Sequence, residues 1–125
     1  MTRRVTPMIH VPDVAAAVEW YRGIGFDVLD VGREDGTGGE AVWALLAFGD
    51  GRVMLNTGGR PSGAERREVD LYVDTEDVEA VYRRLEKRVE VVEGLHDTFY
   101  GMREFIMRDL NRFWITFGQE LPGRR

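Results

Sequence analysis

The chain contains the same strand-to-helix sequence motif twice, and this duplication constrains its fold more than any single residue does. The motif is Val-Pro-Asp-Val-Ala-Ala-Ala-Val at residues 11–18 and Thr-Glu-Asp-Val-Glu-Ala-Val-Tyr at residues 75–82. Each copy follows a short segment of alternating apolar and polar residues and begins a helical pattern. Asp77 lies 64 residues (77 minus 13) beyond Asp13. A repeat of this kind indicates two copies of one supersecondary unit. In 125 residues, two copies predict a single domain made of two halves.

Each half is predicted to have the element order βαβββ. The expected strands are 5–11, 26–31, 41–48 and 52–56 in the first half and 69–73, 89–92, 103–108 and 112–117 in the second, with helices capped by Asp13 and Asp77. A Gly/Pro-rich linker, 58–64, joins module 1 (about 4–58) to module 2 (about 66–119). The fold class is therefore α+β, with two curved mixed sheets in one domain.

Composition limits the function classes. The chain has no cysteine, which excludes thiolate metal sites and thiol nucleophiles and favours a cytoplasmic location. No apolar run approaches the roughly 20 residues of a membrane span, and no apolar signal segment follows Met1. The formal net charge of -5 disfavours nucleic acid and mildly favours cationic partners. We therefore expect neither a membrane nor a nucleic-acid partner.

One amphipathic helix can cover only one face of a four-stranded sheet, so the other face should form a cup. Alternation places the following side chains on the cup faces: Thr6, Met8, His10, Arg52, Met54, Asn56, Asp70, Tyr72, Asp74, Glu104, Ile106, Arg108, Trp114 and Thr116, with Trp43 as the most suitable residue of its strand. Methionines, flat rings and a few charges are typical of a pocket for an organic ligand. The same residues could instead fill a core or a dimer interface, with Arg108 or Arg103 pairing with Glu104 or Asp70.

The loop 97–101 and the two histidines are further candidate functional features. Residues 97–101 place Phe99 and Tyr100 beside a glycine at the rim, where they could stack on a planar ligand or simply pack. His10 at a strand end and His96 in the predicted loop 94–98 are expected to be solvated or hydrogen-bonded.

The sequence resembles the glyoxalase, bleomycin-resistance and extradiol dioxygenase superfamily, called vicinal oxygen chelate, over its whole length. The resemblance rests on residues 8–14, Trp20-Tyr21-Arg22, Gly25-Phe26, 100–105, Arg108-Asp109 and 113–117, and is greatest to the bleomycin-resistance branch. It implies two βαβββ modules, a homodimer that exchanges a strand or module, and ligand sites where cups meet. It also implies a turn where the family has Asp-Pro-x-Gly and this chain has residues 109–112, in which Asn111 can accept a left-handed conformation.

Enzymes of that superfamily hold a divalent metal with His or Glu at four positions. Alignment on the two aspartates places these positions at Thr6, Met54, Asp70 and Thr116. Only Asp70 could ligate a metal, and a catalytic metal needs about three nitrogen or oxygen ligands aimed at one point. We therefore expect no metal and no cofactor.

The sequence thus favours a small-molecule binding protein that sequesters a planar aromatic or cationic compound, as in antibiotic resistance, and no catalytic residue is assigned. The expected ligand-binding residues are Met8, Trp43, Met54, Asp70, Tyr72, Tyr100, Glu104, Trp114 and Thr116. The alternatives are a divalent-metal-dependent lyase, isomerase or dioxygenase with misaligned ligands, and a metal-free enzyme with Asp70 or Glu104 as general base.

Overall fold

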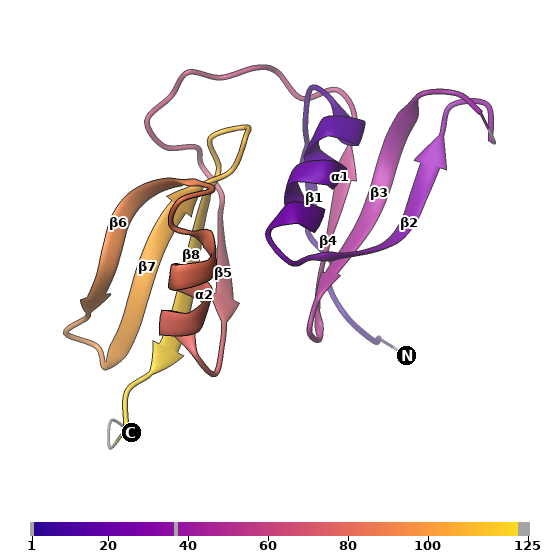
Figure 1. Cartoon of the computed structure of the whole chain (residues 1–125). Coiled ribbons are helices and arrows are strands. Elements are labelled where there is room, and N and C mark those ends of the chain that lie inside the picture. The colour runs from indigo at the N-terminus through magenta and orange to yellow at the C-terminus, as the bar shows by residue number, and fades with distance from the viewer. Residues whose placement is uncertain (1, 37, 123–125) are drawn as a thin grey trace. The chain divides into compact units, whose positions relative to one another are not determined.

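Both halves of the chain contain the same five elements in the same order. The computed structural model describes residues 2–36 and 38–122, which divide between Ser62 and Gly63 into unit 1 and unit 2. Unit 1 contains β1 (Met8–His10), α1 (Val14–Gly23), β2 (Asp27–Arg33), β3 (Ala41–Phe48) and β4 (Gly51–Asn56). Unit 2 contains β5 (Asp70–Asp74), α2 (Val78–Leu85), β6 (Glu90–Asp97), β7 (Met102–Arg108) and β8 (Trp114–Glu120). The predicted α+β class and the repeated βαβββ order are confirmed (Figure 1).

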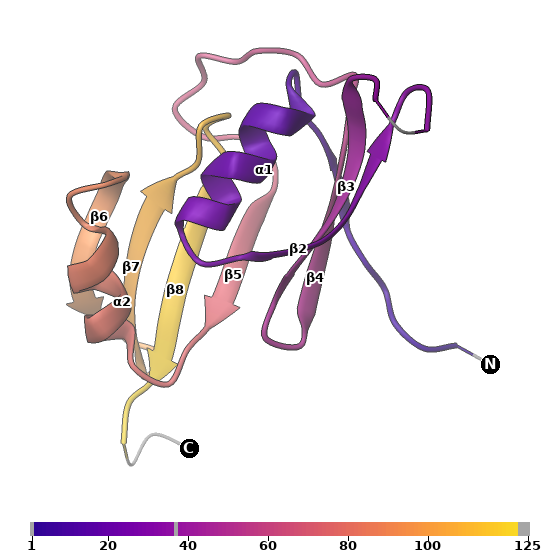
Figure 2. The ribbon, with the colours of Figure 1, turned by 45° about the vertical axis from the view of Figure 1, so that its right-hand side comes forward.

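Each unit has one four-stranded mixed sheet. The strand order is β1-β4-β3-β2 in unit 1. In unit 2 it is β5-β8-β7-β6, which Figure 2 shows. The first strand of each unit pairs in parallel with the last, and the remaining neighbours are antiparallel. The repeated sequence motif therefore corresponds to the same crossover in both units, from the first strand through a helix to the rest of the sheet.

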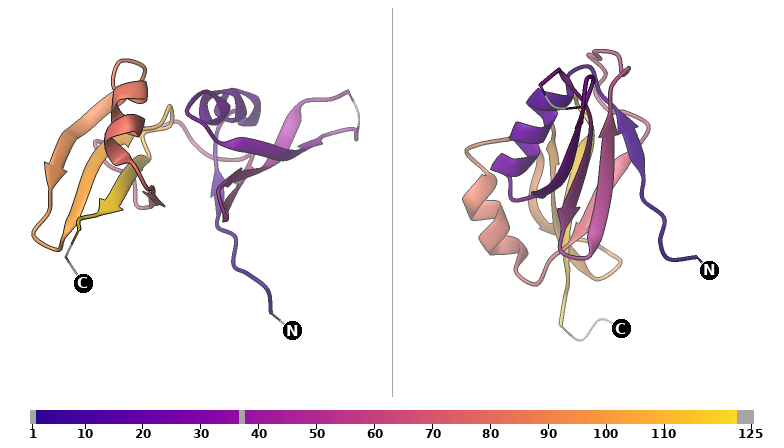
Figure 3. Two further views of the ribbon diagram at one scale, coloured as in Figure 1. Left: turned by 60° about the horizontal axis from the view of Figure 1, so that its bottom comes forward. Right: turned by 90° about the vertical axis from the view of Figure 1, so that its right-hand side faces the viewer.

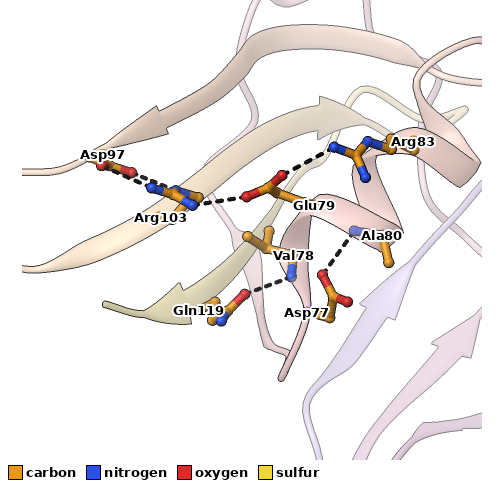
Figure 4. A network of polar contacts seen from close by, with 8 residues as sticks. All are labelled: Asp77, Val78, Glu79, Ala80, Arg83, Asp97, Arg103 and Gln119. Atoms are coloured by element: carbon orange, nitrogen blue, oxygen red, sulfur yellow. Dashed lines mark hydrogen bonds and ion pairs between the residues drawn. The ribbon is translucent and has the colours of Figure 1, made fainter. Parts of the chain in front are cut away.

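Both helices are capped by the aspartates of the repeated motif. Asp13 Oδ1 accepts a hydrogen bond from the backbone N–H of Ala16 at 3.0 Å, and Asp77 Oδ1 accepts one from Ala80 at 3.1 Å. These bonds satisfy N–H groups that have no partner inside the helix. At α2 the side-chain oxygen of Gln119 accepts a further bond from the backbone N–H of Val78 at 2.9 Å (Figure 4).

One face of each sheet is covered by the helix of the same unit (Figure 3). In unit 1, α1 buries Val14, Ala17, Val18 and Tyr21. In unit 2, the rings of Phe105 and Phe117 stack with centroids 5.1 Å apart, and Tyr82 of α2 packs edge-on against Phe105 at 5.0 Å. Among the described residues, no helix is long and apolar enough to cross a membrane.

Arg103 lies on the helix-covered side of the second sheet. It donates to Asp97 of β6 at 2.7 Å and to Glu79 of α2 at 2.9 Å, and Glu79 also pairs with Arg83 at 3.2 Å (Figure 4). The hydrogen bond from Arg103 holds the pKa of the Asp97 carboxyl below its usual range. Because side chains alternate along a strand, the next residue, Glu104, faces away from α2.

Three local expectations were wrong. β1 begins at Met8, so Thr6 precedes the strand, and β6 continues to Asp97, so His96 lies in a strand and not in a loop. The extra length of β6 includes a register shift between Glu93 and His96, an irregularity that alternation does not predict. In the last turn Arg112, and not Asn111, has the positive φ, 69°.

The two caps predict a measurable stability effect. Replacing Asp77 by alanine should lower the free energy of unfolding by about 1 kcal/mol, because the N–H of Ala80 loses its acceptor. Urea denaturation followed by circular dichroism measures the change. The neighbouring Glu76→Ala is the control, and an equal loss in both variants would contradict the capping role.

Candidate functional site

On the uncovered face of unit 1, the structure brings together the predicted methionines and tryptophan. Met8 pairs directly with Met54, and Trp43 pairs with Asn56 of β4. The side-chain amide of Asn56 donates to the sulfur of Met8 at 3.4 Å. Residues that pair directly share a face of the sheet. Met8, Met54 and Trp43 therefore form one mixed thioether and aromatic surface.

His10 ends the same strand as Met8. Its Nδ1 lies 3.0 Å from the carbonyl oxygen of Thr57. Since a carbonyl oxygen only accepts, Nδ1 carries the hydrogen in this contact. The predicted hydrogen-bonded imidazole is thus what the structure has at His10.

On the uncovered face of unit 2, a buried carboxylate lies between two tyrosines. Glu104 is 3% exposed. Its Oε2 accepts a hydrogen bond from the Tyr72 hydroxyl at 2.7 Å, and its Oε1 accepts one from the Tyr100 hydroxyl at 2.8 Å. Burying a charge is costly unless hydrogen bonds compensate it, and each oxygen of Glu104 has such a bond. Three of the predicted site residues therefore form one cluster.

The cluster changes the acidity of both tyrosines. Burial and the hydrogen bond to Glu104 raise the pKa of Tyr72 above its usual range, and the negative charge of Asp74 contributes in the same direction. The pKa of Tyr100 is also raised, chiefly by its hydrogen bond to Glu104, with a further contribution from the charge of Glu93. Both phenols therefore keep their protons at neutral pH, and neither is suited to act as a general base.

The cluster also depends on Gly118, which is not among the predicted site residues. Gly118 pairs with Glu104 on one side and with Asp74 on the other. A Cβ atom at Gly118 would lie 2.1 Å from the hydroxyl oxygen of Tyr72. The missing side chain therefore leaves the space in which the phenol reaches the carboxylate. A glycine inside a strand is a signal for such a close approach.

The other end of the same face is covered by the chain itself. The carbonyl oxygen of Glu65 accepts hydrogen bonds from the indole N–H of Trp114 at 3.1 Å and from Arg108 at 2.9 Å and 3.1 Å. The carboxylate of Glu65 pairs with Arg108 at 3.0 Å. Residues 64–67, which we call the strap, thus satisfy the polar groups at this end of the sheet.

Arg66 of the strap contacts the remaining two predicted residues at this end. Its guanidinium pairs with the carboxylate of Asp70 and lies 4.1 Å from the ring centroid of Trp114. The sequence allows Arg108 or Arg103 to pair with Glu104 or Asp70. In the structure Asp70 instead pairs with Arg66, and Glu104 accepts hydrogen bonds from the two tyrosines.

Thr116 connects the two ends. It is 8% exposed and pairs with Tyr72 on one side and with Ile106 on the other. His96, opposite Glu104 on β7, bonds through Nδ1 with the carbonyl of Gly94 at 2.8 Å, and its Nε2 lies 3.8 Å from Glu93.

The four positions where the superfamily resemblance implies metal ligands carry two hydroxyls, one thioether and one carboxylate. Thr6 lies outside β1, and the Asp70 carboxylate is already paired with Arg66. This donor set does not fit a tightly held zinc, iron, nickel or manganese ion. Within residues 2–36 and 38–122, no three His, Cys, Asp or Glu side chains gather in a way that could hold a metal ion.

The Glu104 cluster predicts a change in tyrosine titration. In Glu104→Gln the pKa of Tyr72 and of Tyr100 should fall toward the ordinary value of about 10, because the variant removes a negative charge and its charge-assisted hydrogen bonds. The near-ultraviolet absorbance of tyrosinate during alkaline titration measures this. Exposed Glu76→Gln is the charge-matched control, and unchanged curves for Glu104→Gln would contradict the cluster.

Comparison with known proteins gives relatives in sequence and in structure. The family described as the glyoxalase/bleomycin resistance protein/dioxygenase superfamily matches residues 4–117. An uncharacterised protein of Mycobacterium bovis is 30% identical over 115 residues, covering 84% of this chain and 75% of its own. A similar protein of Mycobacterium tuberculosis is also 30% identical, with 84% and 67% covered.

Solved structures have the same fold. TioX from Micromonospora sp. ML1 is 25% identical with a TM-score of 0.76, covering 96% of this chain and 100% of its own. A glyoxalase-related enzyme of Clostridium phytofermentans is 15% identical with a TM-score of 0.73, covering 97% of each chain, and this likeness concerns the fold alone. With the family match over nearly the whole chain and the paired βαβββ units, the chain belongs to the glyoxalase/bleomycin resistance protein/dioxygenase superfamily.

Proposed function

We propose that the chain is a small-molecule binding protein that holds a planar, cationic compound without a catalytic metal, as in the bleomycin-resistance branch of its superfamily. The observation that carries the proposal is the Glu104 carboxylate, buried on the uncovered face of unit 2 and held by two tyrosine hydroxyls. A buried negative charge on an otherwise aromatic surface attracts a cation with a flat apolar body. The net charge of -5 favours the same class of ligand.

Exposed rings beside the carboxylate supply the stacking surface. Tyr72 is 50% exposed and Tyr100 is 56% exposed. Phe99 is 92% exposed and lies edge-on to Tyr100, with ring centroids 5.1 Å apart. Large exposed aromatic side chains in one place are uncommon on a surface without a binding role. Cations also bind favourably over such rings.

The uncovered face of unit 1 supports the same class of function. Met8 and Met54 lie side by side, and thioether side chains adapt to irregular apolar shapes. Trp43 adds a flat ring on this face. We propose that Met8, Met54 and Trp43 of unit 1 and Asp70, Trp114 and Thr116 of unit 2 take part in ligand binding, each set on the face of its own unit.

A planar cation and its neutral counterpart test the proposal. We expect isothermal titration calorimetry to show that aminoacridinium binds at least about tenfold more tightly than neutral acridone, because only the cation gains from the Glu104 charge. Copper-free and copper-loaded bleomycin are titrated in parallel as larger probes. Glu104→Gln should reduce the difference, whereas Glu76→Gln should preserve it.

Two results would overturn the proposal. One is the absence of binding for every cationic probe, with the protein shown to be folded. The other is stoichiometric, tightly held nickel, zinc, iron or manganese in the purified protein, which would favour the metal-dependent lyase, isomerase or dioxygenase class.

We further propose that the chain acts in the cytoplasm as a homodimer that exchanges a strand or module. Each sheet has a helix on only one face, and the other face carries exposed apolar side chains such as Met8 and Tyr72, which are 45% and 50% exposed. Light scattering after size exclusion should give twice the chain mass of 14.3 kDa. A monomer at micromolar concentration would contradict this expectation.

A further inference from the structure

The protons of the Glu104 cluster have fixed positions, and this has consequences for any ligand. A tyrosine hydroxyl has one hydrogen to donate and two lone pairs to accept with. Tyr72 and Tyr100 each donate that hydrogen to Glu104. A carboxylate can only accept, so the two bonds leave no other assignment of donor and acceptor. The raised pKa of both phenols keeps their hydrogens in place at neutral pH.

Both hydroxyl hydrogens are therefore used within the cluster, so its three side chains offer a ligand only acceptors; the Thr98 side chain also has a hydrogen bond with Tyr100. The phenol oxygens retain lone pairs, and the carboxylate oxygens retain one acceptor direction each. The tyrosines are half exposed whereas Glu104 is 3% exposed, so a ligand meets the tyrosines first and the carboxylate charge acts from beneath them. The charges of Asp74 and Glu93, which also raise the pKa of Tyr72 and Tyr100 respectively, add to the negative potential.

Among the described residues of β6, His96 is an ionisable group that could oppose this potential. It is paired with Glu104 across the strands, and its Nδ1 contacts the Gly94 carbonyl. Since a carbonyl oxygen accepts, Nδ1 is a donor already in use. Its Nε2 lies 3.8 Å from another carboxylate, that of Glu93. The described partners of His96 are thus acceptors as well.

We infer that Tyr72, Tyr100 and Glu104 form a subsite for a nitrogen cation that carries N–H donors, such as a planar amidinium or guanidinium group, and that it discriminates against quaternary ammonium. This inference rests on the proposed function and narrows its ligand class. Each phenol oxygen, held by a hydrogen bond to one oxygen of the same carboxylate, can accept an N–H of a planar cation. A quaternary cation gains the attraction of the charge and the rings but leaves the acceptors without partners.

Gly118 is the positioning residue of this subsite. Its lack of a side chain allows the Tyr72 hydroxyl to reach Glu104, since a Cβ there would lie 2.1 Å from that oxygen. The Tyr72 side chain is half exposed and can swing outward. A methyl group at this position therefore displaces the phenol without emptying the core.

The test compares two planar cations on the same ring system. Aminoacridinium carries N–H donors, whereas N-methylacridinium has the same tricycle and charge without one. We expect calorimetry to give aminoacridinium about a tenfold lower Kd, the usual gain from a hydrogen bond to a charged partner. Tyr72→Phe, Tyr100→Phe and Gly118→Ala should each remove most of this difference, because each removes or displaces a phenol oxygen that accepts from the ligand.

Tyr82→Phe is the matched control, because Tyr82 packs on α2 against Phe105 and lies outside the cluster. Circular dichroism verifies that each variant is folded. Equal affinity of the wild-type protein for both cations, or a preference for aminoacridinium that survives in all three cluster variants, would overturn the inference and leave the proposed function standing. If neither cation binds the wild-type protein, the proposed function itself fails, and the inference with it.

Discussion

A four-stranded sheet with a single helix has one face that its own unit does not cover, and both units of this chain are built under that constraint. The helix-covered faces hold the apolar side chains, including the Phe105–Phe117 stack and the buried residues of α1. Polar and aromatic residues are consequently confined to the other faces by alternation along the strands. Arg103 and Glu104 illustrate the division: the first binds Glu79 of α2, and the second is bonded to Tyr72 and Tyr100.

On the uncovered face of unit 2, polar groups are stabilised in two different ways. At one end the strap supplies backbone carbonyls, so that Trp114 and Arg108 bond to Glu65. At the other end no strap is present among the described contacts, and side chains alone compensate the charge of Glu104. In the first arrangement the polar groups of the sheet are already bonded to the strap. The second leaves exposed rings and unused acceptor lone pairs, which is why the candidate site lies at that end.

Sequence reasoning predicted the framework because its signals are local. The aspartate caps and the alternation of strand 69–73 each depend on a few neighbouring residues, and both appear in the structure, the second in the burial of β5. The presence of Glu104, Tyr72 and Tyr100 on one surface was also predicted. Their mutual hydrogen bonds were not, because they depend on space above Gly118 and on side-chain directions that alternation leaves undetermined.

Long-range contacts account for the remaining differences. Residues 58–64 have linker composition, which gave no reason to expect that the residues directly after them would cover Trp114 and pair with Asp70. Arg112 has a positive φ, which few residues other than glycine adopt. The bond from its Nε to the carbonyl of Ala64 ties this turn to the strap. Sequence patterns identify turn residues by their local conformational preference. In this turn Arg112 also bonds to a residue 48 positions away in the sequence, and a local pattern does not include such a contact.

The layering of Glu104 beneath the tyrosines limits how strongly the site can select by charge. A ligand nitrogen bonded to a phenol oxygen lies about 5 Å from the carboxylate, where two unit charges interact by about 1–3 kcal/mol for effective dielectric constants between those of water and a protein surface. Hydrogen bonds to the phenol oxygens add a contribution of similar size. Neither contribution dominates. A cation without N–H groups and a neutral compound with N–H groups should therefore each lose about half of the binding free energy that these two contributions supply. Recognition therefore depends on charge and hydrogen-bond donors being present in the same planar group.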